Sequence, residues 1–226
     1  MSFREEGNED HWIPLADLMT GMMMVFLLVS VAVMLKIVHN ETRLRSQYKE
    51  LQDSRALNTV VKEHLIAELN TVLANKLQGW HATFESQSLS VKFNSATVMF
   101  DTGKSNLKPE FVNNLAEFFP LYYTVIKNYE SNIATVSVEG YASSNWGAVE
   151  NPEAAYFLNM QLSQQRANNV LRYLHQLTAS EPQTISYLRD YFTANGYSSS
   201  HKVFNADGSE NHLQSQRVEF RVILRK

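Results

Sequence analysis

An apolar run near the start of the sequence limits how the rest of the chain can fold. It extends from Leu15 to Leu35, and after Asp17 it contains no charged residue before Lys36. As an α-helix, at about 1.5 Å per residue, the run would be about 30 Å long, which is the thickness of the hydrocarbon core of a bilayer. The sequence therefore predicts a transmembrane helix, to which we assign residues 13–38.

Asp17 is the only ionisable residue inside this run. A charged group at membrane depth is costly unless it has a partner or reaches water, so it is a candidate for function. Helical spacing places Thr20 and Gly21 one turn further along the same face, where the small Gly21 would let another helix approach closely. Met24 and Leu28 continue that face. The alternative is that Asp17 lies at the interface and only caps the helix or reaches the head groups.

Residues 16–29 resemble the membrane helix of the B subunit of ion-driven rotary stators, the MotB family of the flagellar motor. The similarity rests on the pattern Ala-Asp-x-Met-Thr-x-Met-Met at residues 16–23. In that family the matching aspartate binds the translocated ion, so the resemblance implies ion translocation at Asp17, with Thr20 beside it. It implies a proton, with Na⁺ as the alternative, and no cofactor.

Composition excludes several other classes of protein. The net charge is −3 and no block of lysine or arginine is long enough for a nucleic-acid site, so we expect no nucleic-acid partner. The chain has no cysteine, which excludes disulfides and thiolate metal sites. We expect no enzyme and no metal centre, because the sequence shows no nucleophile–base spacing, no glycine-rich phosphate loop and no His-x-x-x-His pair.

The orientation of the predicted span rests on two conflicting arguments. Lys36, Arg43 and Arg45 follow the span, and the positive-inside rule would place that side in the cytoplasm. The stator resemblance instead makes residues 1–12 a short cytoplasmic tail. We adopt the second reading, a single-pass protein of the bacterial inner membrane with its C-terminal domain in the periplasm, because the domain described below resembles a cell-wall binder.

Residues 39–79 predict a helical stalk that ends at Gly79. This segment has no other glycine and no proline, and it is rich in residues that favour helices. A stripe of apolar residues runs along it, and we expect the stripe to pair two copies of the chain, the alternative being a solvated connector. Arg55 and Asn58 interrupt a strict heptad and could permit a hinge or a plug. The stripe consists of Leu44, Tyr48, Leu51, Leu57, Val61, Leu65, Leu69, Val72 and Leu77.

Residues 80–226 predict one α+β sandwich domain, in which strands and helices alternate around a small sheet. The expected strands are residues 88–93, 96–100, 133–140 and 217–224. The expected helices begin at Pro109, at about Asn159 and at Pro182, and the second of them runs to Leu177. The predicted fold is therefore a single N-terminal transmembrane helix, a helical stalk and an α+β domain.

This C-terminal part resembles the OmpA-like peptidoglycan-binding domain. Its most specific motif is Asn-x-x-Leu-Ser-x-x-Arg-Ala-x-x-Val at residues 159–170, and segments 100–103, 136–143 and 216–220 also match. The resemblance implies that Arg166 pairs with a carboxylate of diaminopimelate in the wall peptide, a role that suits the guanidinium fork. It implies further wall-binding residues near Arg166, namely Tyr141, Ser143, Asn159, Leu162 and Arg217. The alternative for Arg166 is a surface salt bridge on an amphipathic helix.

One position departs from the family pattern. The family usually has an aspartate, which would meet the ammonium of the peptide, where this chain has Ser143. Either a nearby acid, Glu150 or Glu153, replaces it, or the domain binds wall material more weakly or more selectively.

Taken together, the two resemblances imply the B subunit of a stator. They imply a homodimer inside a ring of a multi-span, MotA-like A subunit, in a 5:2 complex anchored to peptidoglycan. The short acidic tail and the altered wall site bring the chain closer to the MotB-like subunits of Zorya anti-phage systems, which work with ZorA and soluble effectors, than to a flagellar subunit. The competing hypotheses are a flagellar stator subunit and a passive membrane anchor of the wall.

Overall fold

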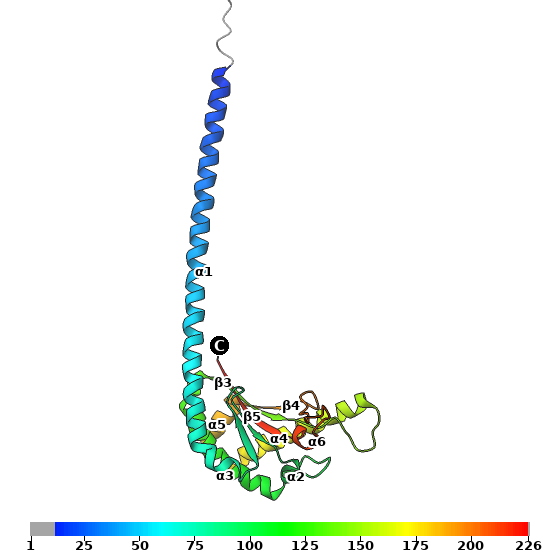
Figure 1. The fold of residues 1–226 in the computed structure, drawn as a ribbon. Helices are drawn as coiled ribbons and strands as arrows, with labels where there is room; N and C mark the ends of the chain where they lie inside the picture. The colour runs from blue at the N-terminus through cyan, green and yellow to red at the C-terminus, as the bar shows by residue number, and fades with distance from the viewer. Residues whose placement is uncertain (1–11, 226) are drawn as a thin grey trace, which may run out of the picture. The chain divides into compact units, whose positions relative to one another are not determined.

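The computed structural model describes residues 12–225, so the predicted cytoplasmic tail lies outside the described residues except for Trp12 (Figure 1). The chain divides into two compact units, with the boundary between Arg55 and Ala56. Helix α1, Trp12–Leu77, contributes to both units. The two units are therefore described separately.

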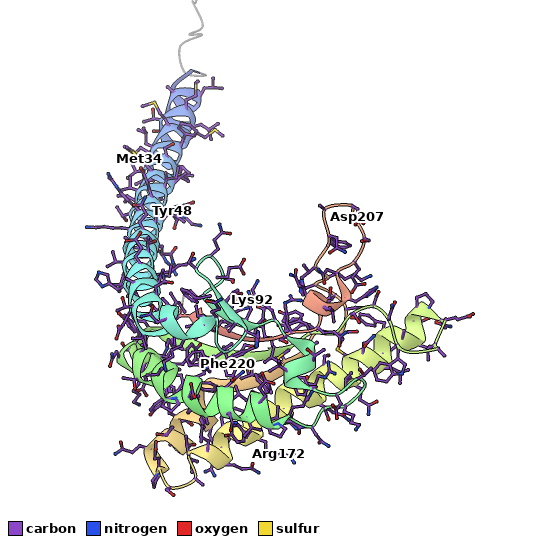
Figure 2. The ribbon with its side chains drawn as sticks, turned by 60° about the horizontal axis from the view of Figure 1, so that its bottom comes forward. Met34, Tyr48, Lys92, Arg172, Asp207 and Phe220 are labelled. Carbon is purple, nitrogen blue, oxygen red and sulfur yellow. The ribbon has the colours of Figure 1, made fainter. Side chains whose placement is uncertain are left out.

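The first unit is the N-terminal part of α1. Its segment Leu15–Lys49 has a mean hydropathy of 2.5 in its most apolar stretch and is long and apolar enough to cross a membrane. Every residue of this segment is exposed, including the methionines of the apolar run, such as Met34 (Figure 2). The predicted N-terminal apolar helix is thus confirmed.

The second unit is built around one five-stranded sheet. Its strands lie in the order β1-β2-β5-β3-β4, and only β3 and β4 run parallel, while the other neighbours are antiparallel. The parallel pair needs a crossover, which the long helix between β3 and β4 provides. The strands are β1 Ala82–Glu85, β2 Ser90–Phe93, β3 Ile133–Gly140, β4 Phe192–Gly196 and β5 Val218–Leu224.

Three helices cover one face of this sheet (Figure 1). They are α3 Pro109–Asn128, α4 Pro152–Leu177 and α5 Pro182–Tyr191, and the shorter elements are α2 Ala96–Met99, the 3₁₀ turn η1 Glu130–Asn132 and α6 His212–Ser215. Phe93, Phe118 and Phe220 meet edge to face at the centre of the core, an arrangement that aromatic rings prefer over direct stacking. The predicted α+β fold is confirmed.

The last turns of α1 belong to this domain. Leu65, Leu69 and Leu73 are completely buried in its core, and their spacing of four residues places them on one face of the helix. Two of these leucines belong to the stripe that we expected to pair two copies of the chain. The compact domain therefore begins at Ala56 rather than at residue 80, and part of the predicted stalk is used within the chain itself.

Other elements also differ from the sequence prediction. Residues 96–100, predicted as a strand, form the short helix α2, because an apolar run of this length fits a helical turn as well as a strand. Helix α4 begins at Pro152, seven residues before the predicted start, since the side chain of Asn151 accepts hydrogen bonds from two backbone N–H groups of its first turn. Strands β1 and β4 and helix α6 were not predicted.

Two glycines bring α4 very close to the sheet. A Cβ atom on Gly140, the last residue of β3, would lie 2.2 Å from the carbonyl oxygen of Ser163, and a Cβ atom on Gly196 would lie 2.4 Å from the backbone nitrogen of Gln164. No side chain other than hydrogen fits at either place. The two glycines thus set the distance between the ends of β3 and β4 and helix α4, which carries the Asn159–Val170 motif.

Candidate functional site

The apolar helix carries the first group of predicted site residues. Asp17 and Thr20 are both exposed on α1. The Thr20 hydroxyl donates a hydrogen bond to the carbonyl oxygen of Ala16, at 2.7 Å, rather than to the carboxylate of Asp17. Around Gly21 the helix surface is empty, with nothing within 4 Å of the place where a Cβ would be. The structure thus leaves the carboxylate and a small-residue surface side by side, both open to a neighbouring helix.

Arg166 occupies an unusual environment on α4. Its side chain is only 4% exposed. Its Nε donates to the carbonyl oxygen of Lys104 at 3.0 Å and its Nη2 to that of Asp101 at 3.4 Å, while the guanidinium lies 4.6 Å from the centre of the Phe100 ring. Among residues 12–225, no carboxylate lies within ion-pair distance of it.

Burial lowers the pKa of Arg166 to about 10, which still leaves the guanidinium charged at neutral pH. The surface salt bridge considered as the alternative for this residue is therefore excluded by its burial and by its partners. The domain thus holds a desolvated cation on neutral carbonyl groups, without an acidic partner among the described residues.

Three other predicted site residues share one cavity, which we call the α4 pocket. Ser143, Asn159 and Leu162 line it together with Thr102 and Gly103 of the turn that holds Arg166. The cavity has a volume of about 420 Å³. The other residues that line it are Ala142, Asn145, Trp146, Gly147, His212 and Gln216.

None of the residues that line the α4 pocket is acidic. Glu150 lies on a separate cavity of about 300 Å³, and Glu153 is exposed in the first turn of α4, so neither of the two proposed replacement acids reaches the pocket. The acid bonded to its rim is Glu210, whose carboxylate accepts hydrogen bonds from the backbone N–H of Ser144, at 3.0 Å, and from the Ser144 hydroxyl. Burial opposes ionisation of Glu210, but these hydrogen bonds lower its pKa below the usual value.

The remaining two predicted residues, Tyr141 and Arg217, lie elsewhere. Alternate residues of β5 point to opposite faces of the sheet, and because Val218 and Phe220 face the helices, Arg217 and Glu219 face away from them. The expectation that Arg217 lies in the same groove as Arg166 is therefore wrong. The Arg217 side chain points away from the helices because side chains alternate along the strand, and the family motif alone does not show this.

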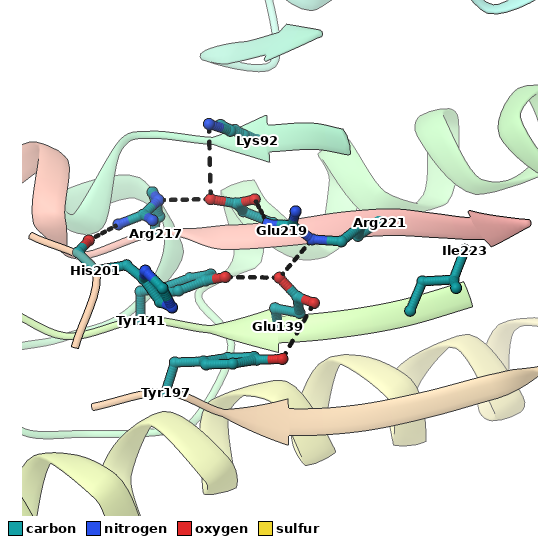
Figure 3. Close-up of a pocket in the computed structure, with 9 residues that line it drawn as sticks. All are labelled: Lys92, Glu139, Tyr141, Tyr197, His201, Arg217, Glu219, Arg221 and Ile223. Atoms are coloured by element: carbon teal, nitrogen blue, oxygen red, sulfur yellow. Dashed lines mark hydrogen bonds and ion pairs between the residues drawn. The ribbon is translucent and has the colours of Figure 1, made fainter. Parts of the chain in front are cut away.

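Tyr141 and Arg217 line a second cavity of about 410 Å³, which we call the sheet-face pocket (Figure 3). Figure 3 shows a row of alternating charges on neighbouring strands beneath it. The alternation Arg217-x-Glu219-x-Arg221 indicates one charged face of a strand, but sequence reasoning did not predict that these residues meet Glu139 and Tyr141 in one pocket. The pocket is lined by Lys92, Glu139, Tyr141, Tyr197, His201, Arg217, Glu219, Arg221 and Ile223.

Two buried glutamates are neutralised within this row. Glu219, 1% exposed, accepts from Nε of Arg217 at 2.7 Å and from Nη2 of Arg221 at 3.1 Å. Glu139, 2% exposed, accepts from Nε of Arg221 at 3.0 Å and from the Tyr141 hydroxyl at 2.6 Å. Burial and the bond to Glu139 raise the pKa of Tyr141 far above its ordinary value, so this hydroxyl stays protonated. Each charge in the row thus has an internal partner, in contrast to Arg166.

The sequence and the fold match known proteins along most of the chain. Residues 99–218 match the OmpA family. The Zorya protein ZorB of Escherichia coli is 34% identical over 222 residues, which cover 97% of this chain and 90% of that protein. These matches confirm the predicted resemblance to the Zorya MotB-like subunits and to OmpA-like domains.

Solved structures are also similar, at lower identity, and one of them with a TM-score above 0.5 shows the same fold. A putative MotB-like protein from Desulfovibrio vulgaris is 20% identical, with a TM-score of 0.51, over 76% of this chain and 98% of that one. The cell wall anchor of the type VI secretion system from Pseudomonas aeruginosa is also 20% identical, with a TM-score of 0.45, over 70% of this chain and 97% of that one. The match to ZorB extends over the apolar helix as well as the domain, so the chain belongs to the ZorB family and carries an OmpA-family domain.

Proposed function

We propose that this chain is the B subunit of a stator-like, ion-driven motor of the inner membrane, that it is anchored to peptidoglycan, and that it works in anti-phage defence. The observation that carries the proposal is the extent of the similarity to ZorB, which covers 97% of the chain. It includes both the apolar helix with Asp17 and the domain with Arg166. A passive anchor would need the wall-binding domain, but it would not need an acidic residue in its membrane helix.

The wall-binding half of the proposal rests on Arg166. A buried guanidinium without a carboxylate partner is costly to keep. Arg166 does not itself line the α4 pocket, but it bonds to the carbonyl groups of Asp101 and Lys104, which flank the pocket-lining residues Thr102 and Gly103. A carboxylate of the wall peptide would complete its charge pair in the bidentate geometry that guanidinium favours. Asn159, Leu162 and Ser143 would contact the rest of the peptide in that pocket.

The ion-coupling half rests on Asp17. One helix cannot enclose its own carboxylate, and Thr20, its predicted neighbour in the ion site, bonds to its own backbone. The partners of Asp17 therefore come from other chains: a second copy of this subunit and the multi-span A subunit around it. In the proposed cycle, contact with the ring removes water from the carboxylate and favours its protonated form, and access to the cytoplasm releases the proton. Alternation between the two copies of Asp17 turns the ring.

Asp17→Asn tests the ion-coupling half. Asparagine keeps the size and hydrogen bonding of the side chain but cannot take up and release a proton. We expect phage protection to be lost, measured as efficiency of plating, while the variant still co-purifies with the A subunit. Glu41→Gln makes the same chemical change in the same helix beyond the apolar run and should leave protection intact. Full protection by Asp17→Asn would rule out ion coupling through Asp17 and leave the passive anchor as the remaining hypothesis.

A second experiment tests the orientation. We expect the C-terminal domain to lie in the periplasm despite Lys36, Arg43 and Arg45, so alkaline phosphatase fused after Lys226 should be active. A cytoplasmic reporter fused at the same place should be inactive. The reverse result would mean that the positive-inside rule decides the topology, and the domain would then have no access to the wall.

A further inference from the structure

The sheet-face pocket has the features of a binding site that the proposed function does not use. It lies on the face of the sheet opposite to α4, and its volume of about 410 Å³ falls in the range of small-molecule sites. Two stacked rings, Tyr141 and Tyr197, form one wall, with ring centres 5.1 Å apart. The charged row of β3 and β5 forms the floor (Figure 3).

Hydrogen-bond donors are in excess in this pocket. The carboxylate oxygens of Glu219 and Glu139 are already occupied by arginine and tyrosine donors. Within the part of the chain that the structure describes, no hydrogen bond involves Nη2 of Arg217 or Nη1 of Arg221. Neither nitrogen is among the enclosed atoms that lack a partner, so both are accessible to solvent, on residues that line the cavity. A ligand that fits here must bring acceptors.

The charge of the pocket agrees with this requirement. Three cationic and two anionic side chains line it, which gives a net charge of +1. Lys92 is also paired with Glu85, at 2.6 Å outside the pocket, so its charge is largely compensated there. Arg217 and Arg221 are paired with Glu219 and Glu139, so the free N–H groups of the two guanidinium groups, rather than a net charge on the row, are what an anion would bind. Arg217 is held in place by the Tyr141 ring, 3.9 Å from its guanidinium carbon, and by the carbonyl oxygen of His201.

We propose that the sheet-face pocket binds a small oxyanion, a carboxylate or phosphate group, through Arg217 and Arg221. Guanidinium groups bind these two anions through parallel hydrogen bonds, and two guanidinium groups fixed by ion pairs to Glu219 and Glu139 lose little freedom when a ligand binds. This site is separate from the proposed wall-binding site, and neither depends on the other.

Ile223 offers a test that leaves the charged row intact. It lines the pocket, is 42% exposed and lies on the same face of β5 as Arg221, whereas removing either arginine would leave a buried glutamate unpaired and could unfold the domain. Ile223→Asp places a negative charge in the cavity, and Ile223→Asn is its neutral control of equal size. Citrate and inorganic phosphate serve as probes, titrated calorimetrically into the full-length protein in detergent, with the ionic strength held constant by chloride.

The wild-type protein should bind at least one probe saturably. Citrate alone would assign the pocket to carboxylates, and phosphate alone to phosphates. Ile223→Asp should weaken binding at least about tenfold, because the new carboxylate repels the anion at close range, and Ile223→Asn should change it less than about threefold. The proposal is overturned if neither probe binds the wild-type protein, or if the two variants weaken binding equally. Peptidoglycan binding through Arg166 should be the same in both variants.

Discussion

Two buried arginines of this domain, Arg166 and Arg217, are similar in burial but opposite in their surroundings. They are 4% and 8% exposed, and each lies against one aromatic ring. Arg217 pairs with the carboxylate of Glu219 on the sheet-face side, whereas Arg166 bonds only to carbonyl oxygens beneath the α4 pocket. One guanidinium is therefore neutralised inside the protein, and the other is not.

This difference separates a charge that is paired within the protein from one that is not. An ion pair in a buried row stabilises the fold only as a unit, because removing one member leaves another charge without water or a partner. A lone buried cation contributes nothing of that kind. An apolar residue of the same size would stabilise the domain at least as well, which supports the proposed role of Arg166 in binding.

The largest effect should follow from breaking the row. Glu219→Gln removes the carboxylate that pairs with Arg217 and one of the two that pair with Arg221, and we expect it to lower the free energy of unfolding by about 3–5 kcal/mol. Chemical denaturation of the full-length protein in detergent, followed by tyrosine and tryptophan fluorescence, measures this change. Glu85→Gln is the matched control: Glu85 is the half-exposed partner of Lys92, and its loss should cost less than about 1 kcal/mol. If both variants lowered the free energy of unfolding equally, the buried ion pairs of the row would be no more important for stability than the ion pair at the surface.

Arg166 should show the opposite pattern. Arg166→Met keeps most of the side-chain volume, so the free energy of unfolding should change by less than about 1.5 kcal/mol. Binding to isolated peptidoglycan, measured by co-sedimentation of the full-length protein, should weaken at least about tenfold, since a charge-assisted hydrogen bond contributes about 1.5–3 kcal/mol.

Arg172→Met is the control for this experiment. Arg172 lies six residues further along α4, is exposed (Figure 2) and should leave both stability and binding unchanged. If Arg166→Met binds the wall as well as the wild type does, the domain keeps the family fold without its ligand, and Arg166 would have to be explained by folding after all.

The smallest effect is expected at Ser143, which lies 6% exposed in the α4 pocket. If the lost aspartate is the reason for weak binding, Ser143→Asp should tighten peptidoglycan binding by up to about tenfold. Ser143→Asn controls for size without charge. Unchanged or weaker binding by the aspartate variant would mean that another acid already meets the ammonium of the peptide. Glu210, bonded to Ser144 at the rim, would then be the first residue to examine.

The elements that the sequence predicted well are those whose patterns are strong and local. Helix α3 has a proline in its first turn and a clear apolar face, and β5 alternates over seven residues. Strand β4 was missed because its sequence, Phe-Thr-Ala-Asn-Gly, has little strand character of its own. It becomes a strand by pairing with β3 in parallel, a contact between distant segments. The start of α4 is a different case: Asn151 followed by Pro152 is a recognisable signal for a helix start, and the predicted start at about Asn159 did not use it.

The sequence predicted which residues belong to the candidate site, but not how they are placed relative to one another. The motif placed Asn159, Leu162 and Arg166 on one helix, and the structure adds that Asn159 and Leu162 share a cavity with Ser143. That Arg217 points to the other face of the sheet depends on the register of β5, which the motif does not contain. That Arg166 lacks an acidic partner depends on the backbone of the 101–104 turn, which is visible only in three dimensions.

The leucines at the end of α1 have a mechanical consequence. Because Leu65, Leu69 and Leu73 are enclosed by the domain, a pull applied through α1 acts on three buried side chains of the core. The same burial shortens the part of the predicted stalk that lies outside the domain. From residue 39 to residue 64 a continuous helix is about 39 Å long, compared with about 62 Å for the whole of residues 39–79. Fewer residues therefore remain between the apolar run and the domain than the sequence predicts.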